Sequence, residues 1–207
     1  MGAPTEIPAW LDVSRETMDR LTVFCDLVRK WTPAINLVSK ADAADLWQRH
    51  LLDSAQLYAL APADAVVWAD LGSGAGFPGL VIAILARQHN PGLQVHLVES
   101  DHRKATFLAQ AMRHLAVSAV LHVDRIEAVP PLAADVISAR ALAPLPLLCG
   151  HMQRHAARSG VALFPKGKAV AAELAACATL WQMNVERWPS RTRPDGVVLK
   201  ISGLRHV

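Results

Sequence analysis

The sequence has few cysteines, no long apolar run and no internal repeat. Its three cysteines lie far apart and form no C-x-x-C pair, which argues against a disulfide scaffold or a zinc site and predicts reduced thiols. No stretch reaches the roughly 18 apolar residues of a membrane-spanning helix, and the amino terminus lacks the charged-then-apolar pattern of a signal peptide. These absences predict a cytoplasmic protein that does not contact a membrane.

Two common catalytic signatures are also missing. Ser73 lies in no G-x-S-x-G elbow, which argues against a serine hydrolase. His151 and His155 are four residues apart, but no third residue with metal-ligand spacing accompanies them. The sequence therefore predicts no metal site.

The 207 residues are enough for one domain with a full core, which we expect to consist of a helical cap (1–62) and an α/β core (63–207). Charge is uneven: residues 1–150 carry 12 Lys and Arg against 15 Asp and Glu, whereas residues 151–207 carry 9 against 3. The basic candidates in this last quarter are Lys166, Lys168, Arg187, Arg191 and Arg193. Such a basic surplus either binds a phosphate backbone or keeps the protein in solution as an ordinary charged surface. Composition does not decide between these two interpretations.

The stretch from Asp70 to Gly79, D-L-G-S-G-A-G-F-P-G, is the most informative part of the chain. It follows a strand-like apolar run and precedes a helix-like one. Glycines at alternate positions (Gly72, Gly74, Gly76) let the backbone turn tightly and approach a ligand. An acid such as Asp70 at the end of the strand repels a pyrophosphate but accepts from the amino group of S-adenosylmethionine (SAM). The stretch therefore predicts a cofactor loop, with SAM favoured.

A dinucleotide remains the alternative ligand. Gly74, Gly76 and Gly79 also satisfy G-x-G-x-x-G, and Glu99 stands where that fingerprint places its ribose-binding acid. Both cofactors use such an acid, because a carboxylate at the end of the second strand accepts from ribose hydroxyls. Gly72, directly after the Asp70-Leu71 pair, makes the first turn earlier than a dinucleotide site requires and favours SAM.

Strand-like and helix-like segments alternate along the chain. We expect one helix from Ser14 to Pro33 and a second over 42–60. The later strands are expected at 66–71, 93–98, 117–123, 135–138, 161–165, 182–188 and 197–201, and the later helices at 78–88, 101–115, 145–157 and 169–180. This order predicts an α/β fold with a doubly wound, mostly parallel sheet, a terminal antiparallel hairpin and an N-terminal helical cap.

Ligands of such sheets bind beyond the carboxyl ends of the strands, where several candidates fall. Ile126 and Glu127 follow the third strand and fit beside an adenine, or they belong to an ordinary solvated loop. Arg140 follows the fourth strand, where its donors suit a carboxylate or phosphate, or a structural salt bridge. Lys166, before Gly167, is a candidate phosphate contact.

Five segments together resemble one family. They are Asn36-Leu37, Arg49 to Ser54, Asp70 to Gly79, Ser138 to Ala141, and Lys166-Gly167. The chain from about residue 20 to 201 resembles the bacterial small-subunit ribosomal RNA guanine-N7 methyltransferases, the glucose-inhibited division protein B family. One departure is that Ala139 separates Ser138 from Arg140, where the family usually has Ser-Arg-Ala.

The resemblance implies a class I SAM-dependent methyltransferase that modifies guanine N7 in 16S ribosomal RNA or the small subunit, acting as a monomer. It implies SAM contacts at Gly72, Phe77, Ile126, Glu127 and Arg140, and an RNA-facing mouth near Asn36, His50, Asp53 and Lys166. Guanine N7 has a free lone pair and loses no proton on methylation, so we expect no catalytic base. A methyltransferase of small molecules or proteins, and a non-enzymatic cofactor-binding regulator, remain as alternatives.

Overall fold

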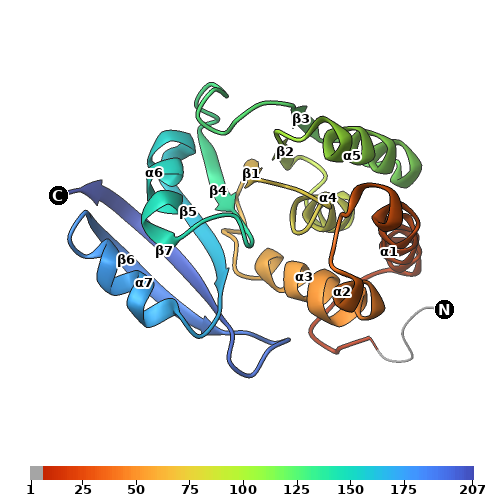
Figure 1. Ribbon diagram of the computed structural model, residues 1–207, viewed down its shortest axis with the longest axis horizontal. Helices are drawn as coiled ribbons and strands as arrows, with labels where there is room; N and C mark the ends of the chain where they lie inside the picture. The colour runs from red at the N-terminus through yellow and green to blue at the C-terminus, as the bar shows by residue number, and fades with distance from the viewer. Residues whose placement is uncertain (1–6) are drawn as a thin grey trace.

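The structure is a computed structural model that describes residues 7–207, apart from the side chain of Lys40. Helices and strands alternate through most of the chain (Figure 1). The helices are α1 (Arg15–Ile35), α2 (Lys40–Ala44), the π-helical turn η1 (Trp47–Leu52), α3 (Asp53–Tyr58), α4 (Gly79–His89), α5 (His102–Leu115), α6 (Leu145–His155) and α7 (Val170–Cys177). The strands are β1 (Val67–Leu71), β2 (Gln94–Val98), β3 (Val120–His122), β4 (Ala134–Ser138), β5 (Ala156–Lys166), β6 (Trp181–Pro189) and β7 (Val197–His206).

The strands form one seven-stranded sheet in the order β3-β2-β1-β4-β5-β7-β6. Only β7 runs against its neighbours, since it pairs antiparallel with both β5 and β6. The expected mostly parallel sheet and terminal hairpin are therefore confirmed. From β1 the chain adds β2 and then β3 on one side of the sheet. It then returns to the other side of β1, where β4 pairs with it. The carboxyl ends of β1 and β4 flank this switch point, where open α/β sheets bind their ligands.

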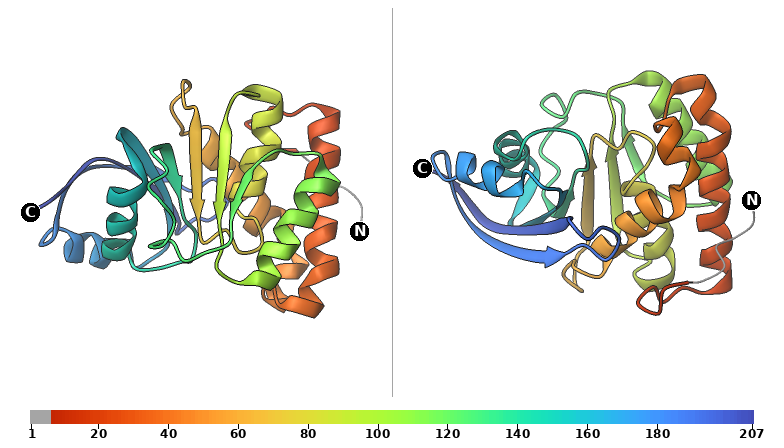
Figure 2. Two further views of the ribbon diagram at one scale, coloured as in Figure 1. Left: turned by 90° about the horizontal axis from the view of Figure 1, so that it is seen from above. Right: turned by 60° about the horizontal axis from the view of Figure 1, so that its bottom comes forward.

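Helices cover both faces of the sheet (Figure 2). Helices α4 and α5, with α1 packed against both, lie over one face, and α6 and α7 lie over the other. Central strands buried on both faces become continuous apolar runs, because neither side meets water. In β1, for example, the adjacent residues Trp68 and Ala69 are both fully buried and belong to separate hydrophobic clusters on opposite faces.

Helix α1 begins at the expected cap and runs past the expected stop. The Ser14 hydroxyl accepts from the Thr17 backbone N–H at 3.2 Å, which satisfies a free donor of the first turn. The prediction that Pro33 ends the helix was wrong, because the helix includes Pro33 and ends at Ile35. Proline has a helix-compatible φ, and here it lies in the last turn. Asn36 then terminates the helix with a left-handed φ of 52°.

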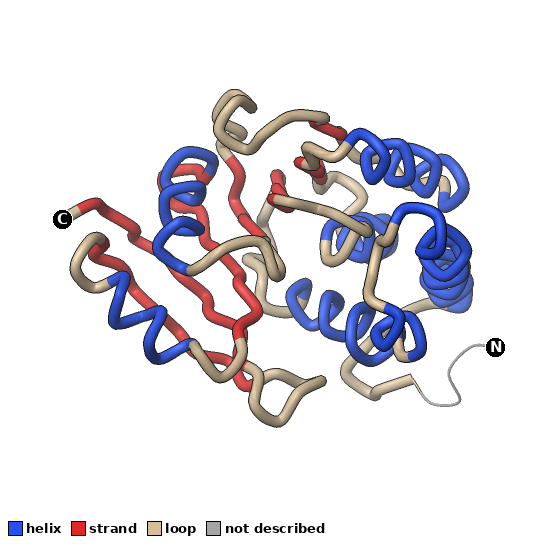
Figure 3. Tube along the Cα trace, in the orientation of Figure 1, coloured by secondary structure: helices blue, strands red, loops and turns tan. Residues whose placement is uncertain are grey.

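The second predicted helix, 42–60, was wrong as a single element (Figure 3). Ser39 caps the short α2, and Asp45 leaves the helical region with φ −131° and ψ 50°. The chain then enters the wider turn η1 and continues directly into α3. Smaller differences occur at β3, which keeps only three residues of the predicted 117–123, and at β5, which begins at Ala156 where the helix was expected to continue.

Phe24 links the cap to the glycine-rich turn between β1 and α4. Its side chain is fully buried on α1, and its ring centroid lies 4.9 Å from that of Phe77. We expect Phe24→Ala to lower the free energy of unfolding by about 3–5 kcal/mol, because a large cavity remains. Val23→Ala, at an exposed position of the same helix, should change it by less than about 0.5 kcal/mol. Urea unfolding of both variants measures the difference, and equal stabilities would contradict the packing described.

Candidate functional site

The turn between β1 and α4 is built on glycines with left-handed backbone. Gly72 has φ 69° and Gly74 has φ 54°, values that residues with a Cβ rarely adopt. A Cβ at Gly72 would lie 2.6 Å from the Leu142 Cδ1 atom, whereas one at Gly74 would meet little but open space. The backbone of Gly74 is therefore open to a ligand, while Gly72 also makes room for the segment after β4.

Glu99, just beyond β2, holds this turn in place. Its Oε2 accepts from the Gly74 N–H at 2.8 Å, and its Oε1 accepts from the Asp101 N–H at 2.7 Å. The residue is only 7% exposed, yet it lines a cavity. Each carboxylate oxygen has a further lone pair, so Glu99 can also accept from ligand hydroxyl groups.

A cavity of about 370 Å³ opens at the carboxyl ends of the parallel strands. We call it the glycine-loop pocket. Its lining residues come from the glycine turn, the end of β2, the start of helix α5, the loop after β3, the segment after β4 and helix α6: Gly72, Gly74, Val98, Glu99, Ser100, Lys104, Asp124, Arg125, Ile126, Glu127, Arg140, Ala141, Leu142, Ala143, Leu147 and His151. Six of the residues predicted from the sequence to bind cofactor lie here: Gly72, Gly74, Glu99, Ile126, Glu127 and Arg140.

Asp70, for which the sequence predicts a contact with a cofactor amino group, is not among the residues that line this pocket. It is 1% exposed, and both of its oxygens are used inside the protein. Oδ2 accepts from the Gly79 N–H at 3.0 Å, and Oδ1 accepts from the Ser138 hydroxyl at 2.8 Å. Burial raises the pKa of the Asp70 carboxyl to about 6, although these hydrogen bonds oppose the rise. Asp70 therefore stabilises the glycine turn through hydrogen bonds inside the protein.

Gly76 and Phe77, which the sequence also predicts to contact the cofactor, do not line the pocket and are packed inside the protein. Gly76 has φ 88°, and a Cβ there would lie 2.7 Å from the Leu80 Cδ1 atom. The Phe77 ring is 4% exposed and lies 5.2 Å, between centroids, from His50. The Arg140 guanidinium lies over the same ring, 5.4 Å from its centroid.

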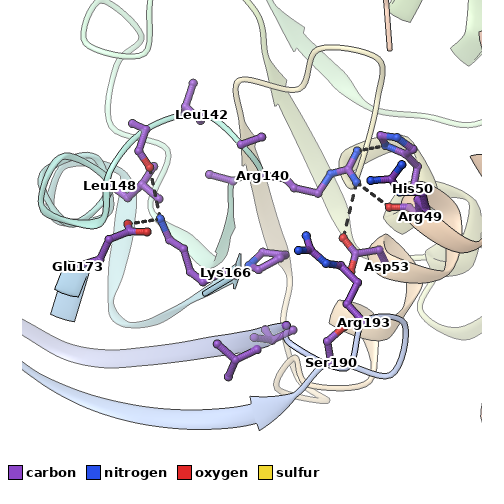
Figure 4. A pocket seen from close by; sticks show the side chains of 18 of the residues that line it. Arg49, His50, Asp53, Arg140, Leu142, Leu148, Lys166, Glu173, Ser190 and Arg193 are labelled. Atoms are coloured by element: carbon purple, nitrogen blue, oxygen red, sulfur yellow. Dashed lines mark hydrogen bonds and ion pairs between the residues drawn. The ribbon is translucent and has the colours of Figure 1, made fainter. Parts of the chain in front are cut away.

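A second cavity, of about 580 Å³, lies between the cap and the end of β5 (Figure 4). We call it the Lys166 pocket. Its basic members are Arg49, Arg140, Lys166 and Arg193, and its acidic members are Asp42, Asp53 and Glu173. The side chains of Arg49 and Arg193 are 54% and 52% exposed, so they meet solvent at the mouth of the pocket.

Arg140 separates the two pockets and lines both. Its Nη1 donates to the Arg49 carbonyl at 3.2 Å and lies 3.6 Å from Asp53 Oδ2, while its Nη2 donates to His50 Nδ1 (Figure 4). A guanidinium has no acceptor, so His50 Nδ1 must be unprotonated. Burial, aided by the Arg140 charge, lowers the pKa of His50 to about 4, so the ring is neutral near pH 7.

Two predicted substrate residues differ from expectation. Lys166 lines its pocket but is largely buried, with its Nζ 2.7 Å from Glu173 Oε2 and 3.3 Å from the Ala143 carbonyl. It is thus already neutralised by an ion pair. Asn36 lies at the C-terminal cap of α1 and lines neither pocket, which corrects its expected place at the mouth. Its residue type is explained by the left-handed backbone.

Sequence reasoning did not assign several residues of the glycine-loop pocket to a cofactor site, among them Leu142 and His151. Leu142 lines both pockets and lies against Gly72, but an apolar residue in a short loop gives no sequence signal. His151 lines the glycine-loop pocket from α6, although only its spacing from His155 had drawn attention to it. The described part of the chain holds no group of three or more potential metal ligands. Within the same residues, no helix is long and apolar enough to cross a membrane.

Solved structures with a similar arrangement of strands and helices include a SAM-dependent methyltransferase and a protein in complex with AdoMet. A TehB-like SAM-dependent methyltransferase from Corynebacterium glutamicum aligns with a TM-score of 0.57 and 16% identity, over 89% of this chain and 98% of that one. The M. jannaschii TYW2 structure in complex with AdoMet aligns with a TM-score of 0.55 and 11% identity, over 76% of each chain. The fold, with its glycine turn and Glu99, is that of a class I SAM-dependent methyltransferase.

The particular family follows from sequence comparisons. The family model GidB, described as rRNA small subunit methyltransferase G, matches residues 17–192, and the chain belongs to this family. Proteins named Ribosomal RNA small subunit methyltransferase G are 51% identical in Cereibacter sphaeroides, over 96% of this chain and 97% of that protein, and 49% identical in Ruegeria pomeroyi, over 95% and 96%. The predicted family and SAM dependence are confirmed, and the dinucleotide alternative is set aside.

The raised pKa of Asp70 predicts a distinct pH dependence of stability. Between about pH 4 and 6 the native state retains a proton that the unfolded state has lost, so this group makes stability fall as pH rises through that window. Asp70→Asn removes this contribution. We subtract the free energy of unfolding of the variant from that of the parent at each pH. This difference should fall by on the order of 2–3 kcal/mol from pH 4 to pH 7. Urea titrations across this range test it, and parallel profiles would contradict the assignment.

Proposed function

We propose that the protein transfers the methyl group of SAM to N7 of a guanine in 16S ribosomal RNA, with SAM in the glycine-loop pocket and the guanine entering from the Lys166 pocket. The observation that carries this proposal is that the segment Arg140–Ala143 lines both cavities. A methyl donor and an acceptor bound on its two sides would approach each other at this segment. The names of the family and of its relatives support ribosomal RNA as the acceptor.

The contacts proposed for SAM follow from the polar groups of the glycine-loop pocket. Glu99 has lone pairs available for the ribose hydroxyls and fixes the Gly74 backbone beside them. Ile126 and Glu127 lie on the opposite wall, where an apolar side chain and a loop backbone suit an adenine. The positive φ of Gly72 keeps the turn clear of side chains at the methionine end.

The charges of the Lys166 pocket support an RNA acceptor. Arg49 and Arg193 stand half-exposed at its mouth, in ion pairs with Asp42 (2.8 Å) and Asp195 (3.7 Å) that water screens, so a phosphate backbone can compete for both. His50 lies deeper and is neutral, so it adds no charge next to the guanine. Lys166 is neutralised by its ion pair with Glu173, and we propose that it shapes the inner wall of the pocket.

The proposed reaction needs alignment rather than proton transfer. When bound, SAM supplies a methyl group on a positively charged sulfonium. The N7 lone pair of guanine lies in the plane of the base and carries no proton, so no residue has to act as a general base. What the protein contributes is the approach of two bound groups, and good alignment lowers a barrier by about 7–11 kcal/mol in favourable cases. Since the target N7 must reach the pocket, the guanine has to be exposed or flipped out of its stack.

We further propose that the chain acts as one methyltransferase domain and as a monomer, in the cytoplasm where ribosomal RNA is processed. The cap and the core both contribute to the Lys166 pocket, which supports a single functional unit. The cysteines Cys25, Cys149 and Cys177 are buried and free, which is compatible with a reducing compartment.

Methyl transfer is tested with radiolabelled SAM and small ribosomal subunits from a strain that lacks the corresponding gene. We expect label in 7-methylguanosine after nucleoside analysis. Glu99→Gln should lower the transfer on the order of 10–100-fold at limiting SAM, because an amide cannot accept equally from two backbone donors. Glu186→Gln, an exposed position on β6, serves as the matched control and should act like the parent.

The outcomes of this experiment separate the alternatives. Label in another nucleoside would overturn the N7 assignment but keep the enzyme class. No label in RNA, despite calorimetric binding of SAM, would contradict the proposed substrate and favour a small-molecule or protein acceptor.

The acceptor side is tested through the salt dependence of RNA binding. Replacing both Arg49 and Arg193 by Gln should weaken RNA binding and reduce the magnitude of the slope of log K against log salt by roughly 1–2. The reason is that fewer counterions are released from the RNA when the protein makes fewer phosphate contacts. Arg113→Gln, exposed at the end of α5 and outside both pockets, is the control and should leave the slope unchanged. An unchanged slope in the double variant would place the RNA elsewhere.

A further inference from the structure

The loop from Asp124 to Val129 forms one wall of the glycine-loop pocket without being part of a helix or strand. Its own backbone supplies two hydrogen bonds, from the N–H groups of Ala128 and Val129 to the Arg125 carbonyl, at 2.9 and 3.2 Å. Most of the loop is exposed, and Val129 is its one fully buried residue. A loop with so few internal bonds needs outside contacts to keep a binding wall in one position.

The last turns of α6 provide these contacts. His155 Nε2 donates to the Ile126 carbonyl at 3.0 Å, and Arg154 Nη2 donates to the Val129 carbonyl at 3.0 Å. One turn earlier, His151 Nε2 lies 3.7 Å from Glu127 Oε1. Three side chains from a single helix thus reach three successive parts of the loop.

The His155 contact is the most constrained of the three. The residue is fully buried, and a carbonyl oxygen only accepts, so Nε2 must carry the proton. Nδ1 has no hydrogen-bond partner among the described residues, and it is also buried. A leucine would fill this space without the free-energy cost of a buried, unpaired nitrogen. The histidine is therefore better explained by its hydrogen bond to the Ile126 carbonyl than by apolar packing.

The same geometry directs His151 and His155 at the loop rather than at a common point where a metal ion could bind. Two histidines one turn apart chelate a metal when both offer a free nitrogen lone pair to the same point. Here His155 Nε2 is committed to a carbonyl, and His151 faces a carboxylate of the loop. The pair is directed at the loop.

We infer that His155, with Arg154 and His151, positions the Asp124–Val129 loop so that Ile126 and Glu127 hold the adenine of SAM. These are positioning residues: they act through the loop and are expected to affect the affinity for the adenosine part of the cofactor. The inference rests on the proposed placement of the adenine, and it does not depend on which acceptor is methylated.

The test compares His155→Leu, which removes the donor, with His155→Gln, whose amide N–H can replace Nε2–H. Calorimetry without RNA measures the affinity of each variant for two probes, S-adenosylhomocysteine and methylthioadenosine. Methylthioadenosine has the adenosine of the cofactor but lacks its amino acid. We expect His155→Leu to weaken both probes by about the same factor, on the order of 10-fold, and His155→Gln to recover most of the loss. In methyl-transfer assays the KM for SAM should rise, with kcat and the KM for RNA within about twofold of the parent.

Controls and a second variant keep the result interpretable. His114→Leu, exposed on α5, should leave both affinities unchanged. Should His155→Leu fail to fold, Arg154→Met removes the bond to Val129 at an exposed position and should weaken both probes several-fold. Unchanged affinity for methylthioadenosine in a folded variant, or a loss that Gln does not rescue, would overturn the inference. Failure of RNA methylation alone leaves these binding results intact, so it tests the proposed function separately.

Discussion

The buried carboxylate of Asp70 is the interaction on which the site depends. It joins the end of β1 to the first N–H of α4 through Gly79 and to the end of β4 through Ser138. Ser138 in turn accepts from the Trp68 indole at 2.9 Å, which closes a buried polar chain across two neighbouring strands. A buried charge without hydrogen-bond partners is costly, so Asp70 and its partners hold one another in place. The position of the glycine turn is set by these hydrogen bonds.

A second polar cluster joins the cap to the core. Arg140 leaves the end of β4 and reaches the η1 turn, where it meets Asp53, His50 and the Arg49 carbonyl. The cap supplies four of the residues that line the Lys166 pocket and the core supplies the rest, so neither part forms that pocket alone. The cluster also explains how one arginine borders two cavities: its side chain passes between them to reach acceptors on the far side.

Much of the fold and the cofactor side followed from local patterns. The alternation of strands and helices, the terminal hairpin and the glycine turn each depend on residues close in sequence, whose φ preferences and apolar periodicity can be read directly. Glu99 and Arg140 were identifiable because polar residues at the carboxyl ends of parallel strands converge. Ile126 and Glu127 were identifiable from their position after the third strand, and the family resemblance implied them as well. Helix ends near Pro33 and Asp45 were misjudged, since packing of the cap decides them.

The sequence by itself determined the sheet, the glycine-rich turn and the family, because these depend on short motifs with strong backbone requirements. Only the tertiary structure decided which polar residues face a ligand and which face the protein. Asp70 and Glu99 end adjacent strands in the same way, yet one is enclosed by Gly79 and Ser138 while the other borders the pocket. The side chains that surround a carboxylate come from distant parts of the chain, and they decide whether its lone pairs are satisfied internally or left for a ligand.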